Sequence, residues 1–135
     1  PTISSMPYWQ ARRGILCFTD NHPYYTQQLA SAIWDLIALG KGDADVINHA
    51  VADIVQAHDL DYERLWLTFN KTDQLMMRFV CQGCNPVKSR MLPTSTMTSS
   101  LKRLAQKGYI INGEKDDYAL EDPFFKEWII QQQQL

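Results

Sequence analysis

The sequence lacks the features of several protein classes. It has no apolar run near the ~20 residues that a membrane-spanning helix needs. It has three cysteines, too few for the disulfide framework of a small secreted domain. No GxxxxGK[ST] phosphate loop is present, because Gly40-Lys41-Gly42 lacks both the first glycine at the required distance and the following serine or threonine. We therefore expect a soluble cytoplasmic chain, without a secretion signal, that neither binds ATP well nor hydrolyses it.

The charge of the chain is unevenly distributed. The formal net charge is -2, and the 45% apolar and 21% charged residues are typical of a globular protein. Residues 1–70 carry four basic and eight acidic side chains, whereas residues 71–120 carry eight basic and four acidic ones. Since only the second of these segments is basic, the pattern favours a polyanionic partner for that segment.

The first two thirds of the chain show helical spacing and no strand alternation. Apolar residues recur there at intervals of three and four, as on one face of a helix. The first two predicted helices span residues 8–18 and 23–39, and a third runs from a cap at Asp43 or Asp45 to about residue 57. A polar break at 58–61 separates it from a fourth helix at 62–69. The fifth begins at Asn70 or Thr72 and ends at residue 83. On the last of these helices, Leu75, Met76, Phe79 and Val80 are expected to be buried.

The stretch 93–120 changes from a helix to a β-ribbon. Pro93 fixes an extended approach, and Thr94 or Ser95 is a good N-cap for the helix that follows. Its buried stripe is Met97, Leu101, Leu104 and Ala105, and Gly108 is the expected residue just past its end. Short strands at 109–111 and 118–120 flank an Asn-Gly turn, which favours a ribbon tip.

These patterns predict a mainly α fold. A helical, lid-like lobe is expected over residues 1–69, and a winged helix-turn-helix with a small β-ribbon over residues 70–130. Asp122-Pro123 begins the closing helix, with Asp at the cap and Pro at the first helical position. The glutamine-rich end, residues 131–135, is expected to be a disordered tail.

Four stretches in this order resemble a known family. They are HPYYTQQLA at 22–30, YERLW at 62–66, SSLKRLAQKGYI at 99–110 and YALEDPFFKEWI at 118–129. The chain resembles the C-terminal region of archaeal-type AAA/STAND P-loop ATPases, relatives of helicase-loader and origin-recognition ATPases. The resemblance implies that a catalytic core with ATP and magnesium lies upstream. It also implies that His22 and Pro23 form a lid turn able to contact the adenine of a nucleotide.

The candidate DNA-binding residues cluster around the 93–120 stretch. Ser95, Thr96 and Ser99 can reach phosphates or base edges from the start of the long helix. The candidate cations for phosphate are Lys88, Arg90, Lys102, Arg103 and Lys115. A solvated basic face that only serves to pack the helix is the competing interpretation. The acidic residues of the ribbon tip also oppose phosphate binding.

Other chemistries find less support in the sequence. The Cys81-x-x-Cys84 spacing can hold zinc or exchange thiols, but a second ligand pair is missing. No catalytic residues, metal site or cofactor are therefore predicted for this chain. The expected partners are double-stranded DNA, the upstream ATPase core and a second copy of the chain, with no membrane. The alternative hypothesis is a winged helix that binds protein or dimerises without contacting DNA.

Overall fold

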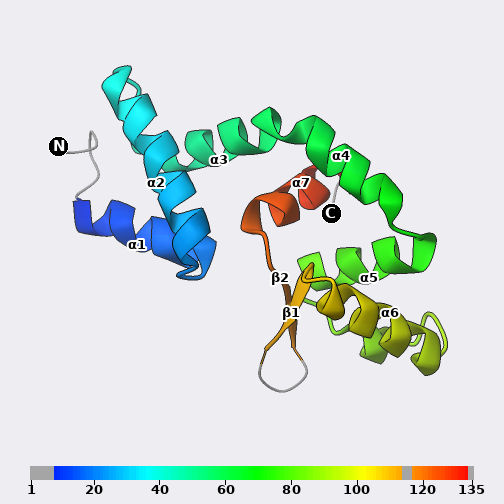
Figure 1. Cartoon of the computed structure of the whole chain (residues 1–135). Helices are drawn as coiled ribbons and strands as arrows, with labels where there is room; N and C mark the ends of the chain where they lie inside the picture. The colour runs from blue at the N-terminus through cyan, green and yellow to red at the C-terminus, as the bar shows by residue number, and fades with distance from the viewer. Residues whose placement is uncertain (1–7, 114–116, 134–135) are drawn as a thin grey trace. The chain divides into compact units, whose positions relative to one another are not determined.

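The computed structural model describes residues 8–113 and 117–133, and Figure 1 shows their path. The predicted fold class is confirmed: the chain is mainly helical, with one small two-stranded antiparallel sheet near its C-terminus. The elements are α1 (Tyr8–Thr19), α2 (Pro23–Ala38), α3 (Val46–Ala57), α4 (Asp59–Thr68), α5 (Lys71–Cys81), the 3-10 helix η1 (Pro86–Ser89), α6 (Thr94–Gln106), β1 (Ile110–Asn112), β2 (Tyr118–Leu120) and α7 (Pro123–Gln133).

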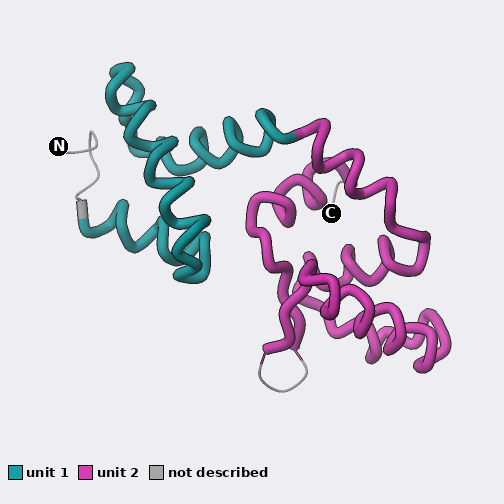
Figure 2. The backbone as a smooth tube through the Cα atoms, viewed as in Figure 1, with its two compact units in different colours: residues 1–58 teal, residues 59–135 magenta. Residues whose placement is uncertain are grey.

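The chain divides into two compact units, coloured separately in Figure 2, which are described one at a time. Unit 1, residues 1–58, contains α1, α2 and α3. Its core forms where α2 packs on α3, and it includes Leu29, Ile33, Val46, Ala50 and Val55. These residues follow the three- and four-residue spacing of the sequence, because only one face of each helix is covered.

The turn between α1 and α2 forms where the sequence predicted a stop. Asp20 and Asn21 both have positive φ, at 52° and 60°, a conformation that asparagine and aspartate tolerate better than most residues. The buried Thr19 hydroxyl lies 2.6 Å from that of Thr26, which ties the two helices together. Pro23 then opens α2, where its missing N–H costs nothing.

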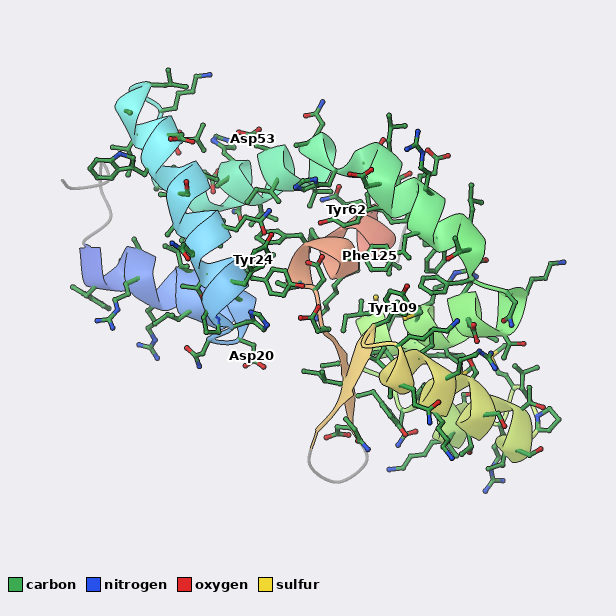
Figure 3. All side chains as sticks on the ribbon, viewed as in Figure 1. Asp20, Tyr24, Asp53, Tyr62, Tyr109 and Phe125 are labelled. Atoms are coloured by element: carbon green, nitrogen blue, oxygen red, sulfur yellow. The ribbon has the colours of Figure 1, made fainter. Side chains whose placement is uncertain are left out.

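Unit 2 spans residues 59–135 and includes α4, which the sequence assigned to the first lobe. The predicted boundary lay between residues 69 and 70, whereas the contacts divide the chain after His58. Aromatic packing is the physical reason. The Tyr62 ring stacks on Phe125 with 5.3 Å between centroids (Figure 3), and Trp66 packs edge-on against Trp128 at 6.3 Å. Helix α4 is thereby part of the core that α7 closes.

The ribbon and α6 complete unit 2. Strand β1 pairs antiparallel with β2, with Ile110 opposite Leu120 and Asn112 opposite Tyr118. The inward residues of the ribbon, Ile110 and Leu120, are both buried, while Ile111 is exposed, so one face of the ribbon covers the core. Gly108 has φ +82° and links α6 to the ribbon, as the sequence predicted.

Side-chain caps form at the start of α5, where Asn70 was one of two predicted starts, and at the start of α7, where Asp122 was the predicted cap. The Asn70 side chain accepts a hydrogen bond from the Asp73 N–H at 2.8 Å at the start of α5. One Asp122 oxygen accepts bonds from the N–H groups of Phe124 and Phe125 at the start of α7, at 2.9 and 3.3 Å.

Several details differ from the sequence predictions. Pro93, not Thr94 or Ser95, is the N-cap residue of α6, because helical geometry begins at Thr94, one or two residues earlier than these predicted caps imply. Met77 and Cys81 are buried on α5 in place of Leu75 and Phe79, so its buried face is rotated relative to the predicted one.

Two predicted non-helical segments are also helical. Residues 59–61 belong to α4, so the polar break is confined to His58. Residues 131–133 of the predicted disordered tail are the last turn of α7, and residues 134 and 135 lie outside the described residues. Phe124, Phe125, Trp128 and Ile129 are buried and hold α7 in place, and the helix continues from them into the glutamines.

Candidate nucleic-acid interface

Basic residues concentrate in the part of unit 2 that contains α5, η1, α6 and β1. Residues 71–113 include seven lysines and arginines and one acidic residue, Asp73. Asp73 is only 5% exposed, and its charge is paired with that of Arg103 within the fold. The exposed cations of this segment are Lys71, Lys88, Arg90, Lys102 and Lys107. The surface of this segment therefore carries positive charge that no exposed carboxylate within it offsets.

The predicted hydroxyl residues lie together on the exposed side of α6. Ser95, Thr96 and Ser99 line one open pocket of about 390 Å³. Asn70, Thr72 and Arg103 complete its wall, so the pocket lies between the start of α5 and α6. None of the hydroxyls of Thr72, Ser95, Thr96 and Ser99 makes a hydrogen bond within the described residues. These groups remain available to a ligand.

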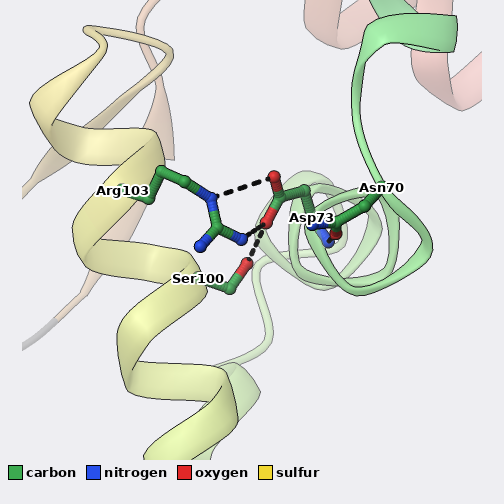
Figure 4. Close-up of polar contacts among 4 residues, drawn as sticks. All are labelled: Asn70, Asp73, Ser100 and Arg103. Carbon is green, nitrogen blue, oxygen red and sulfur yellow. Dashed lines mark hydrogen bonds and ion pairs between the residues drawn. The ribbon is translucent and has the colours of Figure 1, made fainter.

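Arg103 is held by a specific partner rather than projecting freely from α6. The Asp73 carboxylate of α5 forms an ion pair with its Nη2, and the Arg103 Nε donates to the other carboxylate oxygen at 3.3 Å (Figure 4). The buried Ser100 hydroxyl donates to the same carboxylate at 2.6 Å. The hydrogen bond to Asp73 and its negative charge raise the pKa of Arg103 above its ordinary value. Asp73 thus connects two residues of α6 to α5.

The other predicted cations fall at different places. Lys88 is exposed on η1, which contacts α6. Arg90 is exposed directly after η1 and has φ 56°, in the left-handed region. Lys102 is exposed on α6, while Lys115 lies outside the described residues. The structure thus brings Ser95, Thr96, Ser99 and Arg103 into one pocket, and the cations lie on the elements around it.

Sequence reasoning missed six residues of this region: Asn70, Lys71, Thr72, Asp73, Ser100 and Lys107. Thr72 was considered only as a helix start. A weak signal was available for Asp73, since it is the single acidic residue among seven basic ones. A carboxylate among so many cations is a candidate for an internal ion pair, because a charge that becomes buried is costly unless it is paired.

His22 and Pro23, the predicted lid residues, lie at the start of α2 in unit 1. Pro23 is the first residue of the helix, and the half-buried His22 precedes it. The His22 ring lies 4.5 Å from that of Tyr25, measured between centroids. A nucleotide contact by these residues stays a prediction.

The two cysteines of the Cys-x-x-Cys pair have different environments. Cys81 is buried on α5, and burial raises the pKa of its thiol to about 12, whereas Cys84 is exposed. A thiol with so high a pKa is almost wholly protonated at neutral pH and is a poor nucleophile or metal ligand. The described part of the chain contains no group of three or more His, Cys, Asp or Glu side chains placed to hold a metal ion.

Comparisons with protein-family models, with curated proteins and with solved structures find no match to this chain. Within residues 8–113 and 117–133, no helix has both the length and the apolar character to cross a membrane. What the structure shows is a mainly helical chain whose second unit presents α6, with exposed hydroxyl residues and the exposed Lys102, next to a β-ribbon.

Proposed function

We propose that unit 2 is a winged-helix module that binds double-stranded DNA, with α6 entering the major groove and the ribbon beside it. The observation that carries this proposal is the surface of residues 71–113, whose only carboxylate is buried against Arg103 and Ser100. A surface of one sign attracts the phosphate backbone, and this attraction supplies most of non-specific DNA affinity.

The dimensions of α6 suit this role. Its 13 residues extend about 20 Å at 1.5 Å per residue, and the major groove admits an α-helix. Met97, Leu101 and Leu104 fix one side of the helix in the core. The opposite side carries short hydroxyl side chains and Lys102, which allow close approach to base edges and phosphates.

We further propose that the chain is the non-catalytic C-terminal part of a larger P-loop ATPase, with the catalytic core upstream. This part of the proposal rests on the order of the four family-like stretches. Unit 1 would then be the lid region, with His22 and Pro23 next to the nucleotide of the core. The sequence immediately before Pro1 provides the direct check, because a phosphate loop there supports the proposal and a different globular class contradicts it.

The experiment for DNA binding is a titration of the whole chain with a mixed-sequence duplex at two salt concentrations. Lys102→Ala is the test variant, and Lys126→Ala is the control because Lys126 is an exposed lysine on α7. Loss of one phosphate contact should reduce the slope of log K against log salt by about 0.9. No binding at low salt, or equal slopes for the two variants, would contradict the proposal.

An alternative function, protein binding or dimerisation, is favoured by one observation in unit 1. Trp9, Tyr24, Trp34 and Leu39 are each more than half exposed, which is unusual for side chains of this size. Exposed apolar residues that form a patch are a common mark of interaction surfaces. Light scattering distinguishes the two functions: a stable dimer without affinity for duplex DNA supports the alternative.

A further inference from the structure

The ion pair between Arg103 and Asp73 leaves part of the guanidinium unused. A guanidinium has five N–H groups arranged as a planar fork. The Nε–H and one Nη2–H face Asp73, as Figure 4 shows, which is a side-on contact. The end of the fork, made by Nη1 and the second N–H of Nη2, has no partner among the described residues. Arg103 also lines the pocket that contains Ser95, Thr96 and Ser99, and its side chain is 39% exposed.

The charge of this pocket is close to neutral. The negative charge of Asp73 lies directly against the guanidinium and offsets it. The other walls are the neutral side chains of Asn70, Thr72, Ser95, Thr96 and Ser99. A phosphate is therefore attracted to this pocket less strongly than to an exposed lysine such as Lys102. A neutral group with two adjacent hydrogen-bond acceptors suits it better.

We propose that Arg103 reads a guanine in the major groove, and that Asp73 is the positioning residue that aims it. This inference rests on the proposed DNA binding. Guanine presents its O6 and N7 acceptors side by side in the major groove, and no other base does so. The free end of the Arg103 fork matches this pair with two parallel N–H donors. Asp73, which is itself held by the Ser100 hydroxyl, immobilises the Arg103 side chain before binding, so less rotamer freedom is lost when the base is contacted.

Arg103 and Lys102, which the sequence analysis both assigned to phosphate, have different roles. Arg103 sets which base is preferred at one position, while Lys102 and the other exposed lysines contribute affinity for any sequence. Arg103 should consequently contribute little to the salt dependence of binding. Lysine cannot replace it, because an ammonium group lacks the planar pair of donors.

The experiment is selection of preferred sites from a random duplex library, followed by titration of the selected duplex and of its single-base variants. For the wild-type chain, one position should prefer guanine by roughly fivefold to 150-fold. Arg103→Lys should remove this preference and leave the other positions and the salt slope unchanged. Lys102→Ala should do the opposite, lowering the slope by about 0.9 with base preference retained.

Asp73→Asn supplies a readout that a purely structural role would not change. Asparagine keeps one acceptor for Ser100 but removes the charge that offsets Arg103. The freed guanidinium should gain affinity for phosphate, so the salt slope should rise by about 0.9 while the guanine preference weakens. Circular dichroism and thermal unfolding establish whether this buried variant folds, and Arg103→Lys tests the inference independently.

The possible results distinguish failure of guanine recognition by Arg103 from failure of DNA binding itself. A wild-type chain that binds no duplex at low salt contradicts DNA binding itself. Duplex binding with no guanine preference, or with a preference that Arg103→Lys retains, overturns the role of Arg103 and leaves DNA binding standing. A salt slope that falls by about 0.9 in Arg103→Ala assigns Arg103 to phosphate and also overturns the inference.

Discussion

The indole N–H of Trp128 donates a hydrogen bond to the Asp59 carboxylate at 2.7 Å. The two residues are 69 positions apart, and they join the first residue of unit 2 to its last helix. Trp128 is 3% exposed, so its N–H has little access to water. A buried donor without an acceptor is costly, which makes Asp59 important for the stability of this unit.

Asp59→Ala should lower the free energy of unfolding by about 1–3 kcal/mol, because it leaves the Trp128 N–H unsatisfied. Asp59→Asn should cost less, since the amide oxygen still accepts. Glu63→Ala is the matched control, an exposed carboxylate on the same helix. Urea unfolding measures all three, and an equal loss for Asp59→Ala and Glu63→Ala would contradict the role of the hydrogen bond.

Ser100→Ala should destabilise the chain by about 1–3 kcal/mol, because it removes a hydrogen bond from the buried Asp73 carboxylate. Ser99→Ala, a neighbouring exposed position on the same helix, should change stability by less than about 0.5 kcal/mol. Thermal unfolding of the pair isolates the contact from helix propensity, since both variants make the same substitution. A similar effect of the two would show that Ser100 contributes nothing specific.

Cys81 should resist alkylation in the folded chain. At pH 8, iodoacetamide should label the exposed Cys17 and Cys84, while Cys81 should react only after denaturation. Its pKa of about 12 lies above the ordinary value of 9.0, so between these values the unfolded chain loses a proton that the folded chain keeps. This thiol therefore leaves stability unchanged below about pH 9 and lowers it as pH rises toward 12. Rapid native labelling of three thiols in mass spectrometry would refute the prediction.

Arg90→Gly should stabilise the chain by about 0.5–1 kcal/mol, because glycine adopts the left-handed conformation at φ 56° without the steric cost of a side chain. Arg90→Ala removes the same charge but keeps the strain, so it is the control. Both variants should weaken DNA binding equally if Arg90 contacts phosphate. Equal melting temperatures for the two would mean that backbone strain at this position is negligible.

The sequence predicted the elements whose signals are local. The Asn70 cap, the Asp122-Pro123 helix start and the Gly108 helix end each depend on residues only a few positions apart, and each forms. The Asp73–Arg103 pair could not be predicted, because its members are 30 positions apart and their meeting depends on how α5 packs on α6. The rotated buried face of α5, with Cys81 inside, has the same origin, since packing partners decide which side of a helix is covered.

The boundary between the two units also depends on contacts between residues that are far apart in the sequence. The helix predicted at 62–69, which the structure shows at Asp59–Thr68, has the spacing of its predecessors, so periodicity placed it in the first lobe with them. Its membership in unit 2 is decided by aromatic contacts with Phe125 and Trp128, which come from the far end of the sequence. Long-range packing of this kind leaves no local pattern.

At the helix ends Gly83 and Gly108, glycine is favoured by the backbone torsions and not by a lack of space for a side chain. Both glycines have positive φ, and a Cβ atom built on either would meet nothing within 4 Å apart from the residues next to it in the chain. Space is therefore available for a side chain, and only the L configuration is disfavoured. A mirror-image residue prefers these torsions, so D-alanine at Gly108, introduced by chemical ligation, should raise the melting temperature by restricting the unfolded chain. L-alanine should lower it, and the difference between the two measures how strongly this turn depends on chirality.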